Sequence, residues 1–223
     1  MFTVSDDWRT AYPGAFVGVL AMTRVANPKS HQALDEIKAG LEAHIRARYK
    51  SKEEVRSQER LRAYRAYYRP FKKTYHVQMQ LESVALKGKS IPSIAALVEA
   101  MFIAELKNQL LTAGHDLDLV ETPLRLDVAS GDEWFVRING QEQQLKAGDM
   151  FISDQQGVLS AVIYGPDQRT RIRPGTSRAL FTVYAPPGIG ETAVHQHLQD
   201  IESYARLIAS EAETELLEVY GTV

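Results

Sequence analysis

The chain has 223 residues, contains no cysteine and carries a formal net charge of −2. Its length suggests one large domain or two closely joined small ones, and 44% hydrophobic with 24% charged residues is ordinary for a globular protein. The lack of cysteine excludes disulfides, iron–sulfur clusters, thiolate nucleophiles and zinc fingers.

The first half of the chain is dominated by apolar residues at helical spacing. The run Ala15–Val25 is rich in branched residues and predicts a buried strand. Ser51 with Glu54 three residues later is a capping-box pattern, which indicates a helix start. The predicted helices cover residues 29–49, 51–68, 74–86 and 93–111, of which the last is the most apolar and is expected to be central.

After Gly114 the pattern changes to short strand-like runs separated by turn residues. These runs are Leu124–Ala129, Trp134–Ile138, Met150–Ser153, Val158–Tyr164 and Leu180–Tyr184. An amphipathic helix follows, with Val194, Leu198 and Ile201 on one face, and Leu216–Tyr220 is a candidate edge strand. Helices before strands predict a single α+β domain over 1–223, with helices flanking a mixed sheet or sandwich.

No targeting or membrane segment is expected. The N-terminus lacks the basic start and apolar stretch of a signal peptide. The longest apolar run, Ile94–Leu106, is interrupted by Glu99 and Glu105 and is too short to span a bilayer. We therefore expect a cytoplasmic protein with no membrane partner, and the sequence leaves its oligomeric state open.

A basic segment stands out between Arg46 and Lys73. It holds eleven basic residues against three acidic ones, a charge of +8 that leaves −10 for the rest of the chain. Six aromatic residues are interleaved: Tyr49, Tyr64, Tyr67, Tyr68, Phe71 and Tyr75. Cations neutralise phosphates and aromatic faces stack unpaired bases, so the segment predicts RNA binding. The candidate RNA-binding residues are Arg62, Arg65, Arg69, Lys72 and Lys73.

An ordinary solvated helix is an equally good interpretation of this segment. Leu61, Tyr64 and Tyr68 would then form its buried stripe, and its arginines would pair with acidic groups elsewhere.

A similar choice between two interpretations arises at Ala113–Asp118, where Gly114 suits the end of the buried helix. His115 is a candidate general base there, although His115 and Asp116 capping a helix end explains the pattern more simply. Too few ligands gather for a metal site, and no cofactor is expected.

Four short segments together resemble one known module. They are Lys87–Ser93 (Lys-Gly-Lys-Ser-Ile-Pro-Ser), Gly114–Asp118 (Gly-His-Asp-Leu-Asp), Gly148–Asp154 (Gly-Asp-Met-Phe-Ile-Ser-Asp) and Asp167–Thr176 (Asp-Gln-Arg-Thr-Arg-Ile-Arg-Pro-Gly-Thr). In this order they resemble the tRNA-binding and editing module of the phenylalanyl-tRNA synthetase beta chain, formed by its third and fourth B-modules. The resemblance is clearest over 75–186.

The resemblance implies an α+β module that binds tRNA and hydrolyses a wrongly attached amino acid. The chain offers no activation domain, so aminoacylation is not expected, while deacylation of mischarged tRNA in trans is. This sequence departs from the family's editing motifs at two positions, and both bear on the expected hydrolysis. The family's editing histidine aligns with Ala113, and its acidic editing residue aligns nearest to Asp167. Alternatives are an RNA-binding module without chemistry, or a domain that binds an amino acid or nucleoside.

An ester hydrolase needs an oriented water and donors for the oxyanion. The predicted site places the turn at His115 opposite residues 167–170. His115, Asp167 and Thr170 are the candidate catalytic residues, and Gly114, Asp116 and Arg169 the candidate substrate-binding residues. A polar turn between strands is an equally good interpretation of residues 167–170. Trp8 and Trp134 are expected to pack in the core, and no DNA partner is expected.

Overall fold

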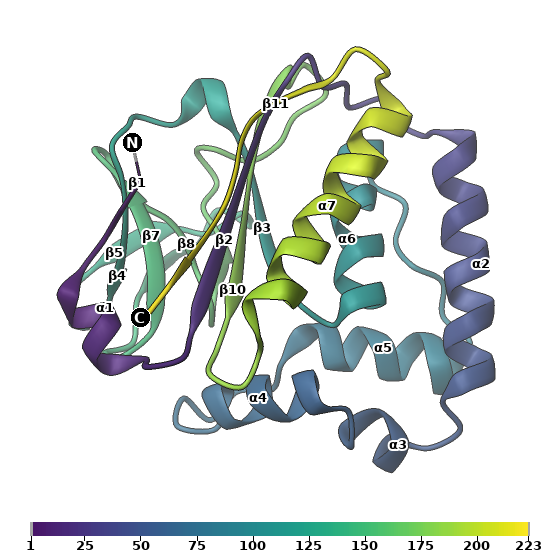
Figure 1. The fold of residues 1–223 in the computed structure, drawn as a ribbon, viewed down its shortest axis with the longest axis horizontal. Helices are drawn as coiled ribbons and strands as arrows, with labels where there is room; N and C mark the ends of the chain where they lie inside the picture. The colour runs from purple at the N-terminus through teal and green to yellow at the C-terminus, as the bar shows by residue number, and fades with distance from the viewer. Residues whose placement is uncertain (1, 223) are drawn as a thin grey trace.

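The computed structural model describes residues 2–222 and confirms the α+β class. Its elements form three layers: a five-stranded sheet, a four-stranded sheet and a layer of helices (Figure 1). The four-stranded sheet lies in the middle and is antiparallel throughout. In order across the sheet, its strands are β11 (Glu213–Gly221), β2 (Phe16–Thr23), β10 (Arg178–Ala185) and β3 (Leu111–Asp116).

The middle position explains why β2 and β10 are nearly continuous runs of apolar residues. A strand that is covered on both faces has no solvent side, so the polar alternation of a half-exposed strand disappears. Residues Val17–Met22 and Ala179–Ala185 are all buried. β11 lies at the edge of the sheet beside β2, as the sequence predicted.

The five-stranded sheet and a separate hairpin cover one face of this middle sheet. The order is β1 (Phe2–Val4), β4 (Leu124–Val128), β7 (Met150–Asp154), β8 (Gly157–Ala161) and β9 (Gly165–Pro166). The hairpin consists of β5 (Trp134–Val136) and β6 (Glu142–Gln144). The two sheets meet where the Tyr184 hydroxyl of β10 lies 2.7 Å from the Ser160 hydroxyl of β8. The short helix α1 (Asp6–Ala11) follows β1.

Helices cover the other face and the lower end of the middle sheet in Figure 1. They are α2 (Gln32–Arg48), α3 (Lys52–Arg56), α4 (Glu59–Tyr68), α5 (His76–Lys87), α6 (Ala96–Asn108) and α7 (Glu191–Ile208). The predicted apolar face of α7 is confirmed, because Val194, Leu198 and Ile201 are fully buried. No helix among the described residues is long and apolar enough to cross a membrane.

The single helix predicted over 51–68 is in fact two helices. The predicted start is correct, since the Ser51 hydroxyl accepts a hydrogen bond from the Glu54 amide at 3.1 Å. The helix then stops because the Ser57 hydroxyl donates to the Glu54 carbonyl and Gln58 adopts an extended backbone with ψ of 133°. Serine side chains compete with the helix for backbone groups in this way. The new helix α4 starts at Glu59.

The prediction that Gly114 ends the buried helix is wrong. Helix α6 ends at Asn108, and Gln109 is its left-handed cap with φ of 59°. Gly114, His115 and Asp116 lie in strand β3 instead of a turn. Gly114 is closely packed there, because a Cβ atom would lie 2.9 Å from the Ile172 Cδ1 atom. Asp116 caps the short 3₁₀ helix η1 (Leu117–Leu119) rather than the end of α6.

A close approach between α7 and β2 yields a prediction about Gly18. A Cβ atom at this position would lie 2.6 Å from Val194 Cγ1 and 3.0 Å from Leu198 Cδ1. Gly18→Ala is therefore expected to lower the free energy of unfolding by about 1–3 kcal/mol through overpacking. Gly40→Ala is the matched control, because Gly40 lies inside α2 with nothing within 4 Å of the new methyl group. It should raise stability by about 0.5–1 kcal/mol. If urea unfolding shows that both variants are more stable than wild type, or that both are less stable, this packing is contradicted.

Candidate functional site: a buried histidine cluster and a basic groove

The predicted catalytic residues lie together, although the predicted turn does not exist. His115 of β3 and Arg171 form an isolated antiparallel bridge, which brings the two segments side by side. The His115 Nδ1 atom is 2.7 Å from the Thr170 hydroxyl, and that hydroxyl donates to Asp167. The Asp116 amide also donates to the Thr170 carbonyl at 2.6 Å. Segment 167–171 thus adds its backbone to the edge of β3.

The hydrogen-bond directions determine which histidine nitrogen carries the proton. Since the Thr170 hydroxyl gives its proton to Asp167, it must accept from Nδ1–H of His115. The Nε2 atom is then an unprotonated acceptor, and this buried atom has no partner among the described residues. The pKa of His115 is lowered to about 3, chiefly by burial and in part by the positive charge of Arg169. His115 is therefore neutral, so its 3.9 Å approach to Asp167 is not an ion pair.

Solvent does not reach the centre of this cluster. His115 and Thr170 have no exposed surface, and Asp167 is 4% exposed. Asp167 nevertheless lines a surface cavity of about 280 Å³ with Trp134 and Arg169. Burial raises the pKa of Asp167, against the hydrogen bonds from Thr170. Of the cluster, only Asp167 is therefore placed to meet a small molecule in that cavity.

The predicted substrate-binding residues differ in their access to that cavity. Gly114 and Asp116 are buried in β3, where Asp116 accepts a hydrogen bond from the Thr176 hydroxyl at 2.8 Å. Arg169 lines the cavity, but its guanidinium is already engaged. It donates to the Leu119 carbonyl at 2.9 Å and to Asp154 at 2.9 Å. Gly114 and Asp116 thus hold the backbone in place, whereas Arg169 lies at the cavity.

The basic segment forms a groove on the outer face of α4. Arg62, Arg65 and Arg69 recur at helical spacing on one face of this helix and its end. They line a cavity of about 620 Å³ together with Arg56 and Lys73. We call these five residues and the cavity the basic groove. Lys72 was also predicted to bind RNA, but it does not line the basic groove.

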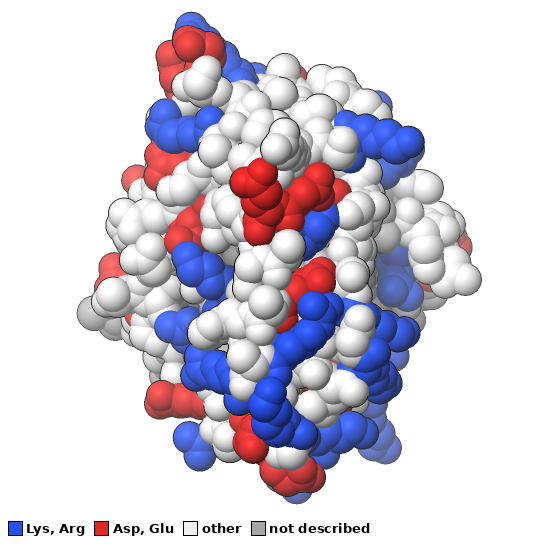
Figure 2. All heavy atoms as spheres, turned by 90° about the vertical axis from the view of Figure 1, so that its right-hand side faces the viewer, with Lys and Arg blue, Asp and Glu red and all other residues white. Residues whose placement is uncertain are grey.

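The cations of the basic groove are mostly unpaired. Arg56 contacts Glu82 at 3.2 Å. Among residues 2–222, no ion pair involves Arg62, Arg65, Arg69 or Lys73. Figure 2 shows Lys and Arg side chains gathered on the lower half of the molecule, the level at which α3 and α5 lie in Figure 1. Arg62, Arg65 and Arg69 therefore do not pair with distant acidic groups, whereas Arg56 does so with Glu82, as the alternative interpretation of this segment required.

The aromatic residues of the segment are buried, and Tyr75 is the one of the six that lines the basic groove. All six are at most 8% exposed, so the expectation that they stack bases beside the cations of the basic groove is wrong. Tyr67 donates from its hydroxyl to Asp149 at 2.7 Å, and Tyr68 to the Val162 carbonyl at 2.7 Å. The Tyr64 hydroxyl accepts from the Leu111 amide at 2.8 Å. These tyrosines anchor α4 to both sheets, which leaves its arginines pointing outward.

The exposure of one tryptophan and the presence of one further cavity were not recognised from the sequence. Trp8 is fully buried as predicted, but Trp134 on the β5–β6 hairpin is 58% exposed beside the cavity of Asp167. Its position in a strand-like apolar run gave no sign of this exposure. A third cavity, lined mostly by apolar residues of α4 with its following loop and of three other loop segments, was also missed because its walls come from four separate parts of the chain.

Comparisons with known proteins match the chain to one family and to two similar proteins. The B3/4 domain family matches residues 60–211. The chain belongs to the B3/4 domain family. It is 28% identical over 69 residues to the phenylalanine–tRNA ligase beta subunit of Mycoplasma genitalium, a stretch that covers 31% of this chain and 9% of that subunit. An N-terminal fragment of the phenylalanyl-tRNA synthetase beta-subunit from Pyrococcus horikoshii superimposes with a TM-score of 0.49 at 10% identity, over 98% of this chain and 53% of the fragment.

The B3/4 match begins at the start of α4 and runs beyond α7. The matched residues therefore contain the buried cluster of His115, Asp167 and Thr170. They also contain three arginines of the basic groove, Arg62, Arg65 and Arg69. Strand β2 and helix α2, which complete the middle sheet and the helical layer, precede the matched residues. The B3/4 domain here is thus built together with elements that the family match does not cover.

The neutral state of His115 predicts how stability of this B3/4 domain depends on pH. The folded pKa is about 3, whereas a histidine in the unfolded chain titrates near 6.5. Between these two pKa values the unfolded state binds more protons than the folded state. The stabilisation that neutral His115 contributes is therefore fully present above about pH 6.5 and is lost as pH falls toward 3. His115→Asn should remove up to about 1.4 kcal/mol per pH unit from that slope. Parallel wild-type and variant curves of unfolding free energy between pH 4 and 6.5 would contradict a buried neutral His115.

Proposed function

We propose that this B3/4 domain binds tRNA through the basic groove. The observation that carries the proposal is the set of unpaired, outward-facing cations Arg62, Arg65, Arg69 and Lys73 around one hollow. Phosphate groups of a folded RNA are the polyanions that such a groove attracts, and release of their counterions favours binding. The family relationship to phenylalanine–tRNA ligase beta subunits supports tRNA as the RNA.

Salt dependence of tRNA binding tests this proposal. If four groove cations contact phosphates, log K against log salt should fall with a slope of roughly −3 to −4. A tRNA transcript should also bind more tightly than a DNA duplex of equal length, because the duplex has a different shape and lacks the 2′-hydroxyl groups. A slope near zero, or equal affinity for the two nucleic acids, would overturn the proposal.

Hydrolysis of mischarged aminoacyl-tRNA in trans is the second candidate function. Asp167 favours it, because this residue lines a surface cavity and its carboxyl group has a pKa raised by burial, which suits a group that accepts a proton from water. Binding stands first because its groove is open, whereas His115 and Thr170 are fully buried.

Incubation with mischarged tRNAs tests the second candidate separately. The wild-type protein should shorten the lifetime of at least one aminoacyl ester, and Asp167→Asn should restore the lifetime seen in buffer. Arg171→Gln is a control, because Arg171 is exposed and does not line the cavity. If every ester is as stable with the protein as without it, the hydrolytic function is excluded and the binding function is unaffected.

A further inference from the structure

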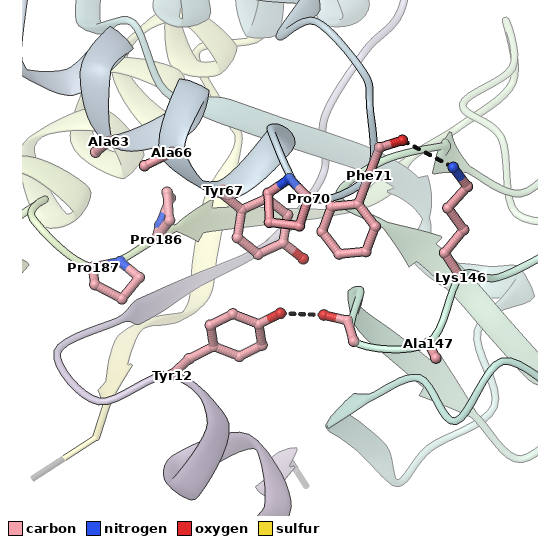
Figure 3. Close-up of a pocket in the computed structure, with 11 residues that line it drawn as sticks. Tyr12, Ala63, Ala66, Tyr67, Pro70, Phe71, Lys146, Ala147, Pro186 and Pro187 are labelled. Carbon is pink, nitrogen blue, oxygen red and sulfur yellow. Dashed lines mark hydrogen bonds between the residues drawn. The ribbon is translucent and has the colours of Figure 1, made fainter.

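A second hollow lies next to the basic groove and has the opposite character. It is a cavity of about 550 Å³ between α4, the end of β10 and the loop before β7. Rings form most of its walls: Tyr12, Tyr67, Pro70, Phe71, Pro186 and Pro187. Figure 3 shows Tyr67, Pro70 and Phe71 on one side of it, Tyr12 opposite, and Pro186 and Pro187 at one end. We call it the ring-lined pocket.

The tyrosine hydroxyls of the ring-lined pocket are already engaged by the protein. Tyr12 donates to the Gly148 carbonyl (Figure 3). Tyr67 donates to Asp149 and accepts from the Met150 amide, each at 2.7 Å. The flat faces of these rings, rather than their polar ends, are therefore left to contact a ligand. Flat apolar walls favour a planar ring, which they can stack against.

One positive charge lies at the rim of the pocket. The Lys146 ammonium group donates to the Phe71 carbonyl at 2.9 Å, opposite the Pro186 end in Figure 3. Lys146 is exposed, and no ion pair among residues 2–222 involves it. A ligand that combines a planar ring with an anionic group would satisfy both the walls and the rim.

The ring-lined pocket and the basic groove share a wall. Ala66 of α4 lines both, and it is an exposed residue whose small side chain leaves no ridge between them. Ala63, one turn earlier, also borders the pocket. A strand whose phosphates lie along Arg62, Arg65 and Arg69 can therefore cross α4 at Ala66 and reach the pocket.

We propose that the ring-lined pocket takes the base of an unpaired nucleotide of the RNA bound in the basic groove, with Lys146 contacting that nucleotide's phosphate. The inference rests on the proposed tRNA binding and adds where the single-stranded part of the RNA goes. It places the aromatic contacts to a base outside the basic groove, on Tyr67 and Phe71 of the basic segment together with Tyr12.

Two tRNA transcripts test the pocket, one with its unpaired 3′ end and one trimmed back to the paired stem. Wild-type protein should bind the trimmed RNA roughly fivefold to a hundredfold more weakly, the range of one stacked base. Ala147→Trp fills the pocket from an exposed position, and it should bind both RNAs with the affinity of wild type for the trimmed one. Lys146→Glu should weaken binding of the intact RNA only.

Lys29→Glu provides the matched control for the charge change, because Lys29 is exposed and precedes α2, at the far end of that helix from α3. It should leave the difference between the two RNAs unchanged. If wild type, Ala147→Trp and Lys146→Glu all bind both RNAs equally, the pocket inference is overturned while the groove remains. If wild type binds neither RNA, the proposed function itself fails. If Ala147→Trp does not fold, the binding of the intact and the trimmed RNA by Lys146→Glu tests the pocket inference on its own.

Discussion

Replacing Arg62, Arg65 and Arg69 with glutamate is expected to weaken tRNA binding by roughly a hundredfold or more at moderate salt, because three phosphate contacts become three repulsions. The three side chains are exposed, so the fold should survive the change. The remaining affinity should also depend less on salt, since each lost phosphate contact reduces the slope of log K by about 0.7–0.9. Filter binding or fluorescence anisotropy at several salt concentrations measures both effects.

A second triple variant separates the groove from the overall charge. Arg9, Lys29 and Arg171 are exposed cations that do not line the groove. Changing them to glutamate alters the net charge by the same amount. If this control loses as much affinity and salt dependence as the groove variant, the protein attracts RNA only through its total charge. A loss confined to the groove variant would place the phosphates along α4.

Lys38→Met is expected to lower the free energy of unfolding by about 3–5 kcal/mol, because it leaves the buried carboxylate of Glu99 without its partner. Glu99 lies on α6 and is 1% exposed. The Lys38 ammonium group of α2 is 2.9 Å from Glu99 and 2.6 Å from the Ser93 hydroxyl. Asp35 completes the cluster at 3.0 Å. Chemical denaturation of the single variant measures the loss.

A double variant distinguishes the uncompensated charge from lost packing. In Lys38→Met with Glu99→Leu both charges are removed, and much of the stability should return because no buried charge remains. Arg24→Ala is the control for an exposed pair, since Arg24 and Glu213 are more than half exposed. It should change stability by about 1 kcal/mol or less. A Lys38→Met variant as stable as Arg24→Ala would show that the buried pair does not stabilise the α2–α6 contact.

Local patterns in the sequence predicted most elements of the fold. Helical spacing of apolar residues identified α2, α5, α6 and α7, and the capping pattern at Ser51 identified the start of α3. The unbroken apolar runs identified β2 as a buried strand and β10 as a strand. Such patterns work because burial repeats with the period of the element itself, about 3.6 residues in a helix and two in a strand.

The site depended more on distant contacts. The resemblance grouped His115, Asp167 and Thr170 correctly, but it did not show that His115 and Thr170 would be sealed from solvent. The bridge between His115 and Arg171 joins segments that are 56 residues apart, and no local pattern predicts how much of each side chain such a bridge covers. The same applies to Trp134, whose exposure follows from the position of a hairpin on the rest of the fold.

The basic segment shows most clearly what the sequence determined and what the tertiary structure decided. The sequence alone established that a charge of +8 and six aromatic residues lie within residues 46–75. Only the packing of α4 on two sheets decided that Tyr64, Tyr67 and Tyr68 turn inward while Arg62, Arg65 and Arg69 face solvent around one hollow. The physical reason is that a tyrosine can bury its ring and still pair its hydroxyl, as Tyr67 does with Asp149, whereas an unpaired guanidinium must remain hydrated.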